Sequence, residues 1–184
     1  MGLLENKTAI VTGSSRGIGA EVAKILAAEG AAVVVNYRQK APRANKVVAE
    51  IEADGGRAAA IGADLTTQEG VQALASAAME NFGSLDLLVL NASGGMETGM
   101  EEGYALKLNR DAQVNMLNAA VALMPHGSRV VFVTSHQAHF IDTVPPCPST
   151  SPWPAASAPA RTHSGPWSRT WPRRGSRSWS SPAT

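Results

Sequence analysis

The sequence contains a single cysteine, Cys147, among its 184 residues. One cysteine excludes an intramolecular disulfide and a zinc site built from several thiolates, and it fits a reducing cytoplasm. No apolar run reaches the length of a membrane-spanning helix, and residues 1–7 lack the basic and apolar regions of a signal peptide. We therefore expect a cytoplasmic protein with no membrane partner.

Residues 145–184 lack most of the residue types from which a hydrophobic core is built. They contain nine of the eleven prolines and all four tryptophans, but no Val, Ile, Leu, Met, Phe, Tyr, Asp, Glu or Lys. A segment of this composition cannot bury enough apolar surface to offset the entropy of ordering the chain. The sequence therefore predicts a folded domain at residues 1–144 and a low-complexity, disordered tail at residues 145–184.

Charge follows the same division, with 11 Lys+Arg and 15 Asp+Glu in the first 144 residues against five Arg and no acid in the tail. The tryptophans and arginines of residues 167–174 could stack on bases and meet phosphates. Arginines in a Pro/Ser-rich segment need no partner, however, so we do not expect a nucleic-acid partner. His126, His136 and His139 have no cysteine-rich or glutamate-rich setting, and we predict no metal site.

The first 144 residues alternate between short apolar runs and amphipathic segments. Strands are predicted at residues 7–11, 31–35, 58–61, 85–90 and 129–133, and helices at residues 21–29, 46–53, 69–81 and 104–124. The run at 85–90 is almost continuously apolar, as in strands buried on both faces. Five strands interleaved with four helices predict an α/β fold with a doubly wound parallel sheet, truncated after the fifth strand.

A glycine-rich loop, Thr12-Gly13-Ser14-Ser15-Arg16-Gly17-Ile18-Gly19, follows the first predicted strand. Parallel sheets bind ligands beyond the carboxyl ends of their strands, where a helix N-terminus offers free N–H groups to a pyrophosphate. We expect Gly13 to make the tight turn, Gly17 to let phosphates approach the backbone, and Gly19 to let the helix pack closely. A glycine-rich loop standing alone could equally bind nothing.

The spacing Thr-Gly-x-x-x-Gly-x-Gly resembles the first loop of the short-chain dehydrogenase/reductase family. Two more family motifs follow in order: Asp64-Leu65 after the third predicted strand, and Asn91-Ala92-Ser93-Gly94, which resembles Asn-Asn-Ala-Gly, after the fourth. The resemblance implies a Rossmann-like, NAD(P)-binding domain. The cofactor-binding residues that it implies are Gly13, Ser14, Ser15, Arg16, Gly17, Ile18, Gly19, Arg38, Asp64, Leu65, Asn91 and Gly94.

Two further positions match catalytic residues of the family. Asn109, fifteen residues before Met124, aligns with the asparagine of the family's catalytic network, and Ser135 with the serine that hydrogen-bonds the substrate oxygen. Taken singly, a polar residue in a helix and a serine at a strand end would explain both. The resemblance implies a small carbonyl or alcohol substrate, and relatives often form homo-oligomers.

The choice of cofactor depends on the end of the second predicted strand, which reads Asn36-Tyr37-Arg38. An acid here would accept a hydrogen bond from the ribose 2′-hydroxyl of NAD, whereas a basic residue would meet the 2′-phosphate of NADP. Arg16 and Arg38 could converge on that phosphate in bidentate fashion. We therefore expect NADP(H) in preference to NAD(H), although arginines on an open surface would need no ligand.

The family's chemistry requires a tyrosine as general acid/base and a lysine shortly after the serine, and this chain has neither there. Its only tyrosines are Tyr37 and Tyr104, and its last lysine is Lys107. The resemblance therefore implies an oxidoreductase by descent, and we expect the chain as written to have little or no activity. The alternative is a non-catalytic dinucleotide-binding module.

The composition of the tail suggests a frameshift near Pro145 or Pro146, because GC-rich coding sequence read out of frame yields mainly Pro, Ala, Arg, Ser, Thr, Gly and Trp. Back-translation in the neighbouring frame permits a tyrosine codon across Ser149 and Thr150 and a lysine codon across Ala156 and Ser157. Codon degeneracy permits this decoding without requiring it. We treat the frameshift as a hypothesis.

Overall fold

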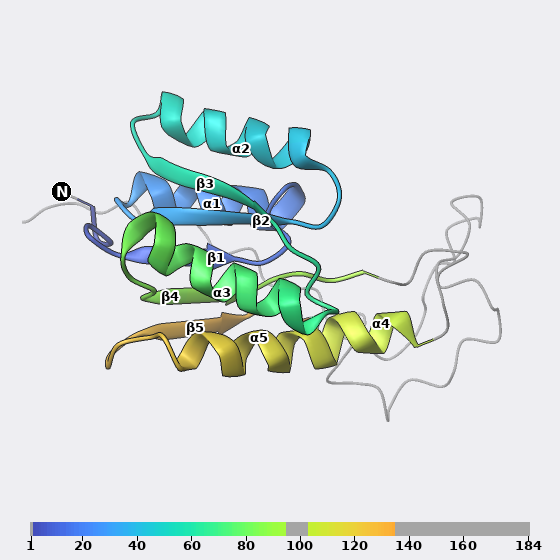
Figure 1. The fold of residues 1–184 in the computed structure, drawn as a ribbon. Helices are drawn as coiled ribbons and strands as arrows, with labels where there is room; N and C mark the ends of the chain where they lie inside the picture. Colours follow the sequence, from blue (N-terminus) through green and yellow to red (C-terminus); the bar gives the residue numbers. More distant parts are fainter. Residues whose placement is uncertain (1, 95–102, 135–184) are drawn as a thin grey trace, which may run out of the picture. The chain divides into compact units, whose positions relative to one another are not determined.

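The computed structural model describes residues 2–94 and 103–134. All of them belong to one compact unit that ends at Pro145. The elements in chain order (Figure 1) are β1 (Thr8–Val11), α1 (Gly17–Ala28), β2 (Ala32–Tyr37), α2 (Ala41–Ala53), β3 (Arg57–Gly62), α3 (Gln68–Phe82), β4 (Leu87–Leu90), α4 (Tyr104–Leu106), the π-helical segment η1 (Lys107–Asp111), α5 (Ala112–Val121) and β5 (Arg129–Phe132). The predicted tail at 145–184 and the boundary at 144 lie outside the described residues.

The five described strands form one parallel sheet in the order β3-β2-β1-β4-β5. The chain moves outward from β1 to β3, returns through α3 to the other side of β1, and continues outward through β5. This order is that of a doubly wound, Rossmann-like sheet, with its reversal between β1 and β4. The predicted α/β fold class is therefore confirmed.

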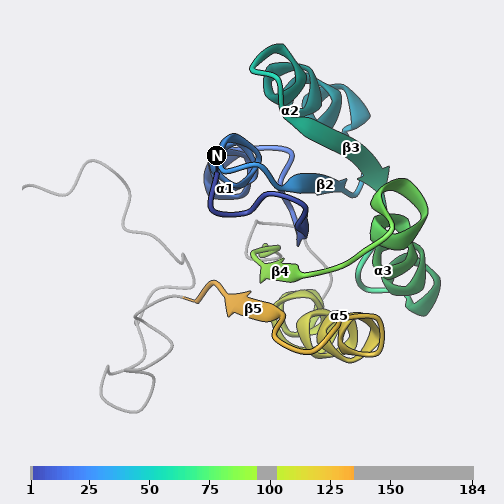
Figure 2. The same ribbon diagram turned by 90° about the vertical axis from the view of Figure 1, so that its left-hand side faces the viewer.

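The sheet separates two hydrophobic cores, and α1 and α3 lie on opposite sides of the central strands (Figure 2). One core joins Val11, Val33 and Val35 to α1 and α2. The other joins Ile10 and Leu88 to α3 and α5. Alternate residues of each strand thus enter different cores, so strands buried on both faces must be continuously apolar.

Two predicted helices begin earlier in the structure than the pattern indicated. The first begins at Gly17 and not at Glu21, and the second at Ala41 and not at Lys46. In α2 the first turn contains Pro42, which suits a position where the backbone N–H needs no partner. Apolar periodicity misses such turns because the residues that they bury, Gly19, Ala20 and Ala44, are small, and their other residues do not enter the core.

The last predicted helix, at residues 104–124, is divided in the structure. A helical run from Tyr104 to Val121 contains the π-helical segment Lys107–Asp111 at its centre. A π-helical turn inserts extra backbone and often marks a functional site. The sequence pattern could not show this insertion. A π-helical turn changes the backbone hydrogen bonds from i→i+4 to i→i+5, and this change has no characteristic amino-acid composition.

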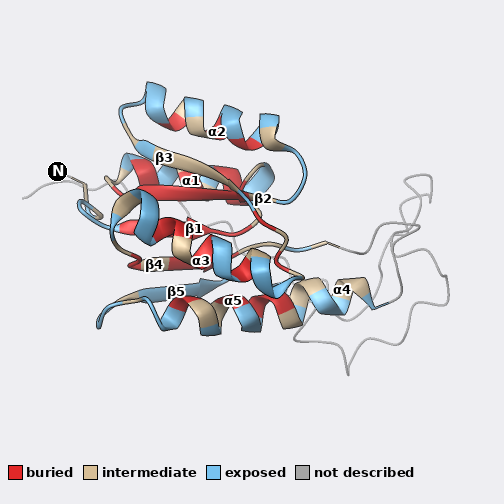
Figure 3. Ribbon diagram, in the orientation of Figure 1, coloured by how far each residue is buried: buried red, intermediate tan, exposed pale blue. Residues whose placement is uncertain are grey.

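Strand β5 is the most exposed part of the described sheet. Its residues Val130, Val131 and Phe132 are between 41% and 53% exposed, whereas Val33 to Val35 in β2 are fully buried (Figure 3). In the register of the sheet, β5 follows β4 at the edge. Within the described ranges, no helix is both long and apolar enough to cross a membrane.

Candidate cofactor-binding site

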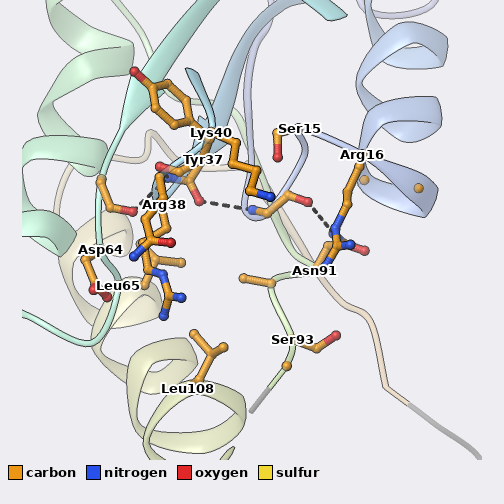
Figure 4. A pocket seen from close by; sticks show the side chains of 18 of the residues that line it. Ser15, Arg16, Tyr37, Arg38, Lys40, Asp64, Leu65, Asn91, Ser93 and Leu108 are labelled. Carbon is orange, nitrogen blue, oxygen red and sulfur yellow. Dashed lines mark hydrogen bonds between the residues drawn. The ribbon is translucent and has the colours of Figure 1, made fainter. Parts of the chain in front are cut away.

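A cavity of about 470 Å³ lies at the carboxyl edge of the sheet, where the loops after β1, β2, β3 and β4 meet. Its volume falls within the usual range for small-molecule sites. The crevice between β1 and β4 is the point where the strand order reverses, which is where open parallel sheets bind ligands. Figure 4 shows Arg38, Asp64 and Asn91, which follow three different strands, around the same space.

The glycine loop after β1 is packed too tightly for larger residues at two positions. Gly13 has a φ of +63°, and a Cβ there would lie 2.9 Å from the Cα of Ala92. A Cβ on Gly19 would lie 2.5 Å from Nδ2 of Asn91 and 2.8 Å from the carbonyl oxygen of Gly13. The tight turn expected at Gly13 is present, and Gly19 lets α1 approach the β4 loop as well as the glycine loop.

The N-terminus of α1 opens into this cavity without a side-chain cap. Arg16 occupies the N-cap position in an extended conformation and makes no capping hydrogen bond. Gly17 has a φ of +57°, and a Cβ there would meet no atom within 4 Å. The first turn therefore presents uncapped N–H groups and the positive end of the helix dipole beside open space, which is the usual arrangement for a phosphate.

Asn36 near the end of β2 links the glycine loop to the end of β3, and it was not among the predicted site residues. Its Oδ1 accepts a hydrogen bond of 3.0 Å from the N–H of Gly13, while its Nδ2 donates to the carbonyls of Ile61 and Ala63 at 3.4 and 3.2 Å. The residue is 3% exposed. Asn36 therefore fixes the glycine loop relative to β3, and its buried amide is fully used in doing so.

Ser14 belongs to the same bonded cluster and does not line the cavity. Its hydroxyl donates to the carbonyl of Val11 at 2.6 Å and accepts from the N–H of Asn36 at 3.0 Å. The residue is fully buried. Among the residues predicted from the glycine loop, Ser14 thus supports the loop from inside, whereas Ser15, Arg16 and Ile18 line the cavity.

The β4 loop is held to the glycine loop by Thr12 and Asn91. The Thr12 hydroxyl accepts from the N–H groups of Asn91 and Ala92 at 2.8 and 2.9 Å. Asn91 Nδ2 donates to the carbonyl of Thr12 at 3.0 Å and lies 3.4 Å from that of Gly13. These bonds close the cavity wall at the crevice between β1 and β4, where Asn91 had been predicted.

Asp64 and Leu65 form the cavity wall after β3. Asp64 Oδ1 accepts from the N–H and the hydroxyl of Thr66 at 2.9 and 2.7 Å. Partial burial favours a higher pKa for Asp64, but the hydrogen bonds from Thr66 and the charges of Arg38 and Lys107 outweigh it and hold that pKa below its usual value. The cap of α3 is Thr67 and not Asp64, which leaves an ionised carboxylate at the cavity.

Basic side chains gather where the cavity meets the end of β2. Arg38 and Lys40 line the cavity there, and Arg43 of α2 also lines it. Arg16, which was predicted to converge with Arg38, lines the cavity at the glycine loop on the other side (Figure 4). All four are exposed, so their charges can meet a ligand. Lys40 and Arg43 were not predicted as site residues, although the spacing Arg38, Lys40, Arg43 directly after a strand was a usable signal.

Asn109 lies in the π-helical segment and holds the end of the β4 loop. Its Nδ2 donates to the carbonyl of Gly94 at 2.9 Å, and its Oδ1 accepts from the N–H of Gly94 at 3.1 Å. Gln113, one turn further on, donates to the carbonyl of Ala92. Asn109 and Gly94 are thus brought together as two predicted site residues, while Ser135 lies outside the described residues.

Two cavity residues come from the helical run that follows the β4 loop, and neither was predicted. Tyr104 and Leu108 line the cavity opposite the strand ends. Nothing in their sequence neighbourhood distinguishes them from core residues of an amphipathic helix. In the described part of the chain, no group of three or more His, Cys, Asp or Glu side chains could hold a metal ion.

A doubly wound sheet with an uncapped helix N-terminus at its strand reversal defines a dinucleotide-binding class of protein. The family model of short chain dehydrogenases matches residues 7–147 of this chain, and the chain belongs to that family. The match extends over every described strand and helix.

Curated relatives agree with this assignment. An uncharacterized oxidoreductase of Methylorubrum extorquens is 43% identical over 122 residues, which are 66% of this chain and 49% of the relative. The 1-cyclohexenylcarbonyl-CoA reductase of Streptomyces collinus is 38% identical over 136 residues, or 71% of this chain and 49% of that enzyme. The chain spans about half the length of these curated relatives.

Solved structures share the fold at similar identity. A short-chain dehydrogenase from Burkholderia cenocepacia in complex with NADP is 40% identical, with a TM-score of 0.69, over 74% of this chain and 58% of that one. A 7α-hydroxysteroid dehydrogenase complexed with NADH is 35% identical, with a TM-score of 0.68, over 74% and 56%. Both nicotinamide cofactors thus occur among proteins of this degree of similarity.

Proposed function

We propose that this chain binds NADP(H) in the cavity at the carboxyl edge of the sheet, as the cofactor-binding half of an oxidoreductase acting on a carbonyl or alcohol. The proposal rests on the positive charge beside β2, where Arg38, Lys40 and Arg43 line the cavity. No acid lies between Asn36 and Arg43 to accept from a 2′-hydroxyl. Cations in this place match a 2′-phosphate, which NADP carries and NAD lacks.

The remaining residues of the cavity fit the other parts of a dinucleotide. The uncapped first turn of α1, with open space beside Gly17, would hold the pyrophosphate. Asp64 and Leu65 would contact the adenine, and Asn91 and Gly94 would line the path toward the nicotinamide. Asp64 is held by Thr66, Asn91 by Thr12 and Gly94 by Asn109.

The cofactor would supply the hydride to a carbonyl or accept it from an alcohol, and the chain's own residues would bind and orient the reactants. Asn109 would hold the β4 loop, and Ser135 would donate to or accept from the substrate oxygen. Proton transfer to that oxygen needs a general acid, which in this family is a tyrosine paired with a lysine. Neither Tyr37 nor Tyr104 follows Ser135, so we propose that the 184-residue chain binds cofactor without normal turnover.

Titration calorimetry of the purified chain with NADPH and NADH tests the cofactor assignment. We expect NADPH to bind at least about tenfold more tightly, because one or two charge-assisted hydrogen bonds to the 2′-phosphate suffice for that ratio. Arg38→Ala should reduce the preference severalfold. Arg129→Ala, at the amino end of β5 and outside the cavity lining, is the matched control and should leave it unchanged. Equal affinities for the two cofactors would contradict the assignment.

A turnover assay distinguishes an active oxidoreductase from a module that binds the cofactor without catalysis. We expect NADPH oxidation with a panel of ketones and aldehydes to stay near the background rate while the cofactor binds. Activity at the level of an ordinary reductase would overturn the proposal that the chain lacks a general acid. Absence of both binding and turnover would overturn the proposed function as a whole.

The frameshift hypothesis has its own test in the gene. Sequencing across codons 140 to 184 would show whether the neighbouring frame contains tyrosine and lysine codons across Ser149/Thr150 and Ala156/Ser157. If it does, expression of that frame after residue 144 should restore turnover. If the codons differ, the tail belongs to the protein and the non-catalytic reading is favoured.

A further inference from the structure

The end of β2 is contacted by a residue from a distant part of the chain. The guanidinium carbon of Arg38 lies 5.4 Å from the centre of the Tyr104 ring, within the range of a cation–π interaction. Tyr104 is the first residue of α4 and Arg38 directly follows β2, and both line the cavity. The contact therefore lies at the place proposed for the 2′-phosphate.

The Arg38 side chain needs such a contact if its guanidinium is to have a defined orientation before a ligand binds. Its side chain is exposed, and within the described ranges it makes no hydrogen bond or ion pair. An unconstrained arginine loses considerable rotamer entropy when it binds a phosphate, and a planar guanidinium that is already stacked loses less. The Tyr104 ring thus acts on Arg38 before any ligand arrives.

Tyr104 is itself held by a well-anchored element. It begins the helical run that continues through η1 into α5, where Ala112 and Met116 are at most 1% exposed in the core. The same run is bonded to the β4 loop through Asn109 and Gly94. The backbone at Tyr104 is therefore anchored, through this helical run, to the core and to the β4 loop.

The hydroxyl of Tyr104 is not required by the described fold. Its oxygen is buried and has no hydrogen-bond partner among the described residues. A phenylalanine would therefore serve the packing equally well, since removing an unpaired hydroxyl breaks no bond. The π face of the ring, and not its hydroxyl, makes the contact with Arg38.

We propose that Tyr104 is a positioning residue that holds the Arg38 guanidinium toward the 2′-phosphate and so contributes to the preference for NADP(H). This inference rests on the proposed binding of NADP(H). It makes cofactor preference depend on the helix after β4 as well as on the residues after β2. Tyr104 does not itself contact the phosphate.

The experiment measures binding of two probes, 2′,5′-ADP and 5′-AMP, to the full chain by titration calorimetry. They differ only in the 2′-phosphate, so their ratio of affinities isolates its recognition. For Tyr104→Leu, we expect 2′,5′-ADP to bind roughly two- to fivefold more weakly, the loss expected for an exposed cation–π contact, with 5′-AMP binding unchanged. Tyr104→Phe is the matched control and should keep the wild-type ratio.

A double variant separates positioning from general damage to the fold. In an Arg38→Ala background, Tyr104→Leu should leave the ratio unchanged, because no guanidinium remains to be positioned. Thermal unfolding of each variant checks the fold, and Tyr104→Met replaces Leu if the latter unfolds the chain.

Several outcomes would overturn the inference. Tyr104→Leu could weaken both probes equally, Tyr104→Phe could behave like Tyr104→Leu, or the ratio could stay at its wild-type value in Tyr104→Leu. In the last case the wild-type preference for 2′,5′-ADP would stand and only the role of Tyr104 would fail. Equal binding of both probes by the wild-type chain would instead overturn the proposed function, and this inference with it.

Discussion

Two buried polar side chains connect neighbouring strands, one at the carboxyl ends of the strands and the other at the amino ends. Asn36 joins the loops at the carboxyl edge, as described above, and Asp86 does the same at the amino edge. Asp86 is 8% exposed, and its carboxylate accepts from the N–H of Thr8, the hydroxyl of Ser84 and the ammonium of Lys7 at 3.0, 3.1 and 3.0 Å. A buried carboxylate is tolerated here because each oxygen has a donor.

Asp86→Asn should destabilise the fold by about 1.5–3 kcal/mol at pH 7, the usual range for hydrogen bonds to a charged group. Most of this effect comes from Thr8 and Ser84, because Lys7 is half exposed and its attraction is screened by water. The free energy of unfolding from urea titration, compared with that of the wild type, is the measurement.

The difference in free energy of unfolding between the wild type and Asp86→Asn should depend on pH. Burial favours a higher pKa for Asp86, but the hydrogen bonds from Lys7, Thr8 and Ser84 outweigh it, so the pKa lies below its usual value. A carboxyl whose pKa is lower in the folded state stabilises fully above its unfolded pKa, about 4, and loses this effect as pH falls through the folded pKa. The difference between wild type and Asp86→Asn should therefore shrink between about pH 5 and pH 2, and a constant difference would contradict this account.

At the scale of elements, the helical run from Tyr104 to Val121 connects the cavity to the core. Its π-helical segment contains Asn109, whose amide bonds both backbone groups of Gly94. Its last part, α5, packs Met116 and Ala120 against the core beneath β4. A single element thus supports the β4 loop, and through Tyr104 it also contacts the end of β2.

Asn109→Ala should release the β4 loop from this helix. Two hydrogen bonds are lost, so we expect a loss of about 1–3 kcal/mol in the free energy of unfolding and a severalfold weaker affinity for NADPH, because Gly94 no longer holds its position. Urea unfolding and calorimetry measure the two effects. Asn118→Ala, an exposed position of α5, is the matched control and should change neither. Unchanged NADPH affinity in Asn109→Ala would show that the loop does not depend on this contact.

For the molecule as a whole, the exposed apolar strand β5 is the notable surface. Exposed apolar strands at the edge of a sheet favour pairing with another chain. Val131 is 52% exposed and Phe132 is 53% exposed, and they point to opposite faces, since Val131 is in register with Val89 and Phe132 with Leu90. We therefore expect the chain to self-associate as its concentration rises.

Val131→Lys should reduce this association while changing the free energy of unfolding by less than about 0.5 kcal/mol, as is usual for exposed positions. Sedimentation velocity over a range of concentrations measures the association. Asn45→Lys, which adds the same charge on the exposed side of α2, is the control and should associate like the wild type. If the lysine at 131 leaves the association unchanged, β5 is not the surface responsible.

The sequence by itself determined the order of strands and helices and the place of the glycine loop. These features depend on local chemistry, because apolar runs such as Leu85 to Leu90 and the glycines at 13, 17 and 19 act within a few residues of themselves. The resemblance to the short-chain dehydrogenases rested on the same local motifs, and the family match over residues 7–147 bears it out.

Only the tertiary structure decided which polar side chains serve the cavity and which serve the fold. Ser14 and Asn36 are adjacent in space but 22 residues apart, and their mutual bonds make Ser14 a support of the loop. Lys40, Arg43 and Tyr104 reach the cavity because α2 and α4 begin beside the strand ends. The roles of Ser14, Asn36 and Tyr104 depend on contacts between elements distant in sequence, and no local pattern encodes them.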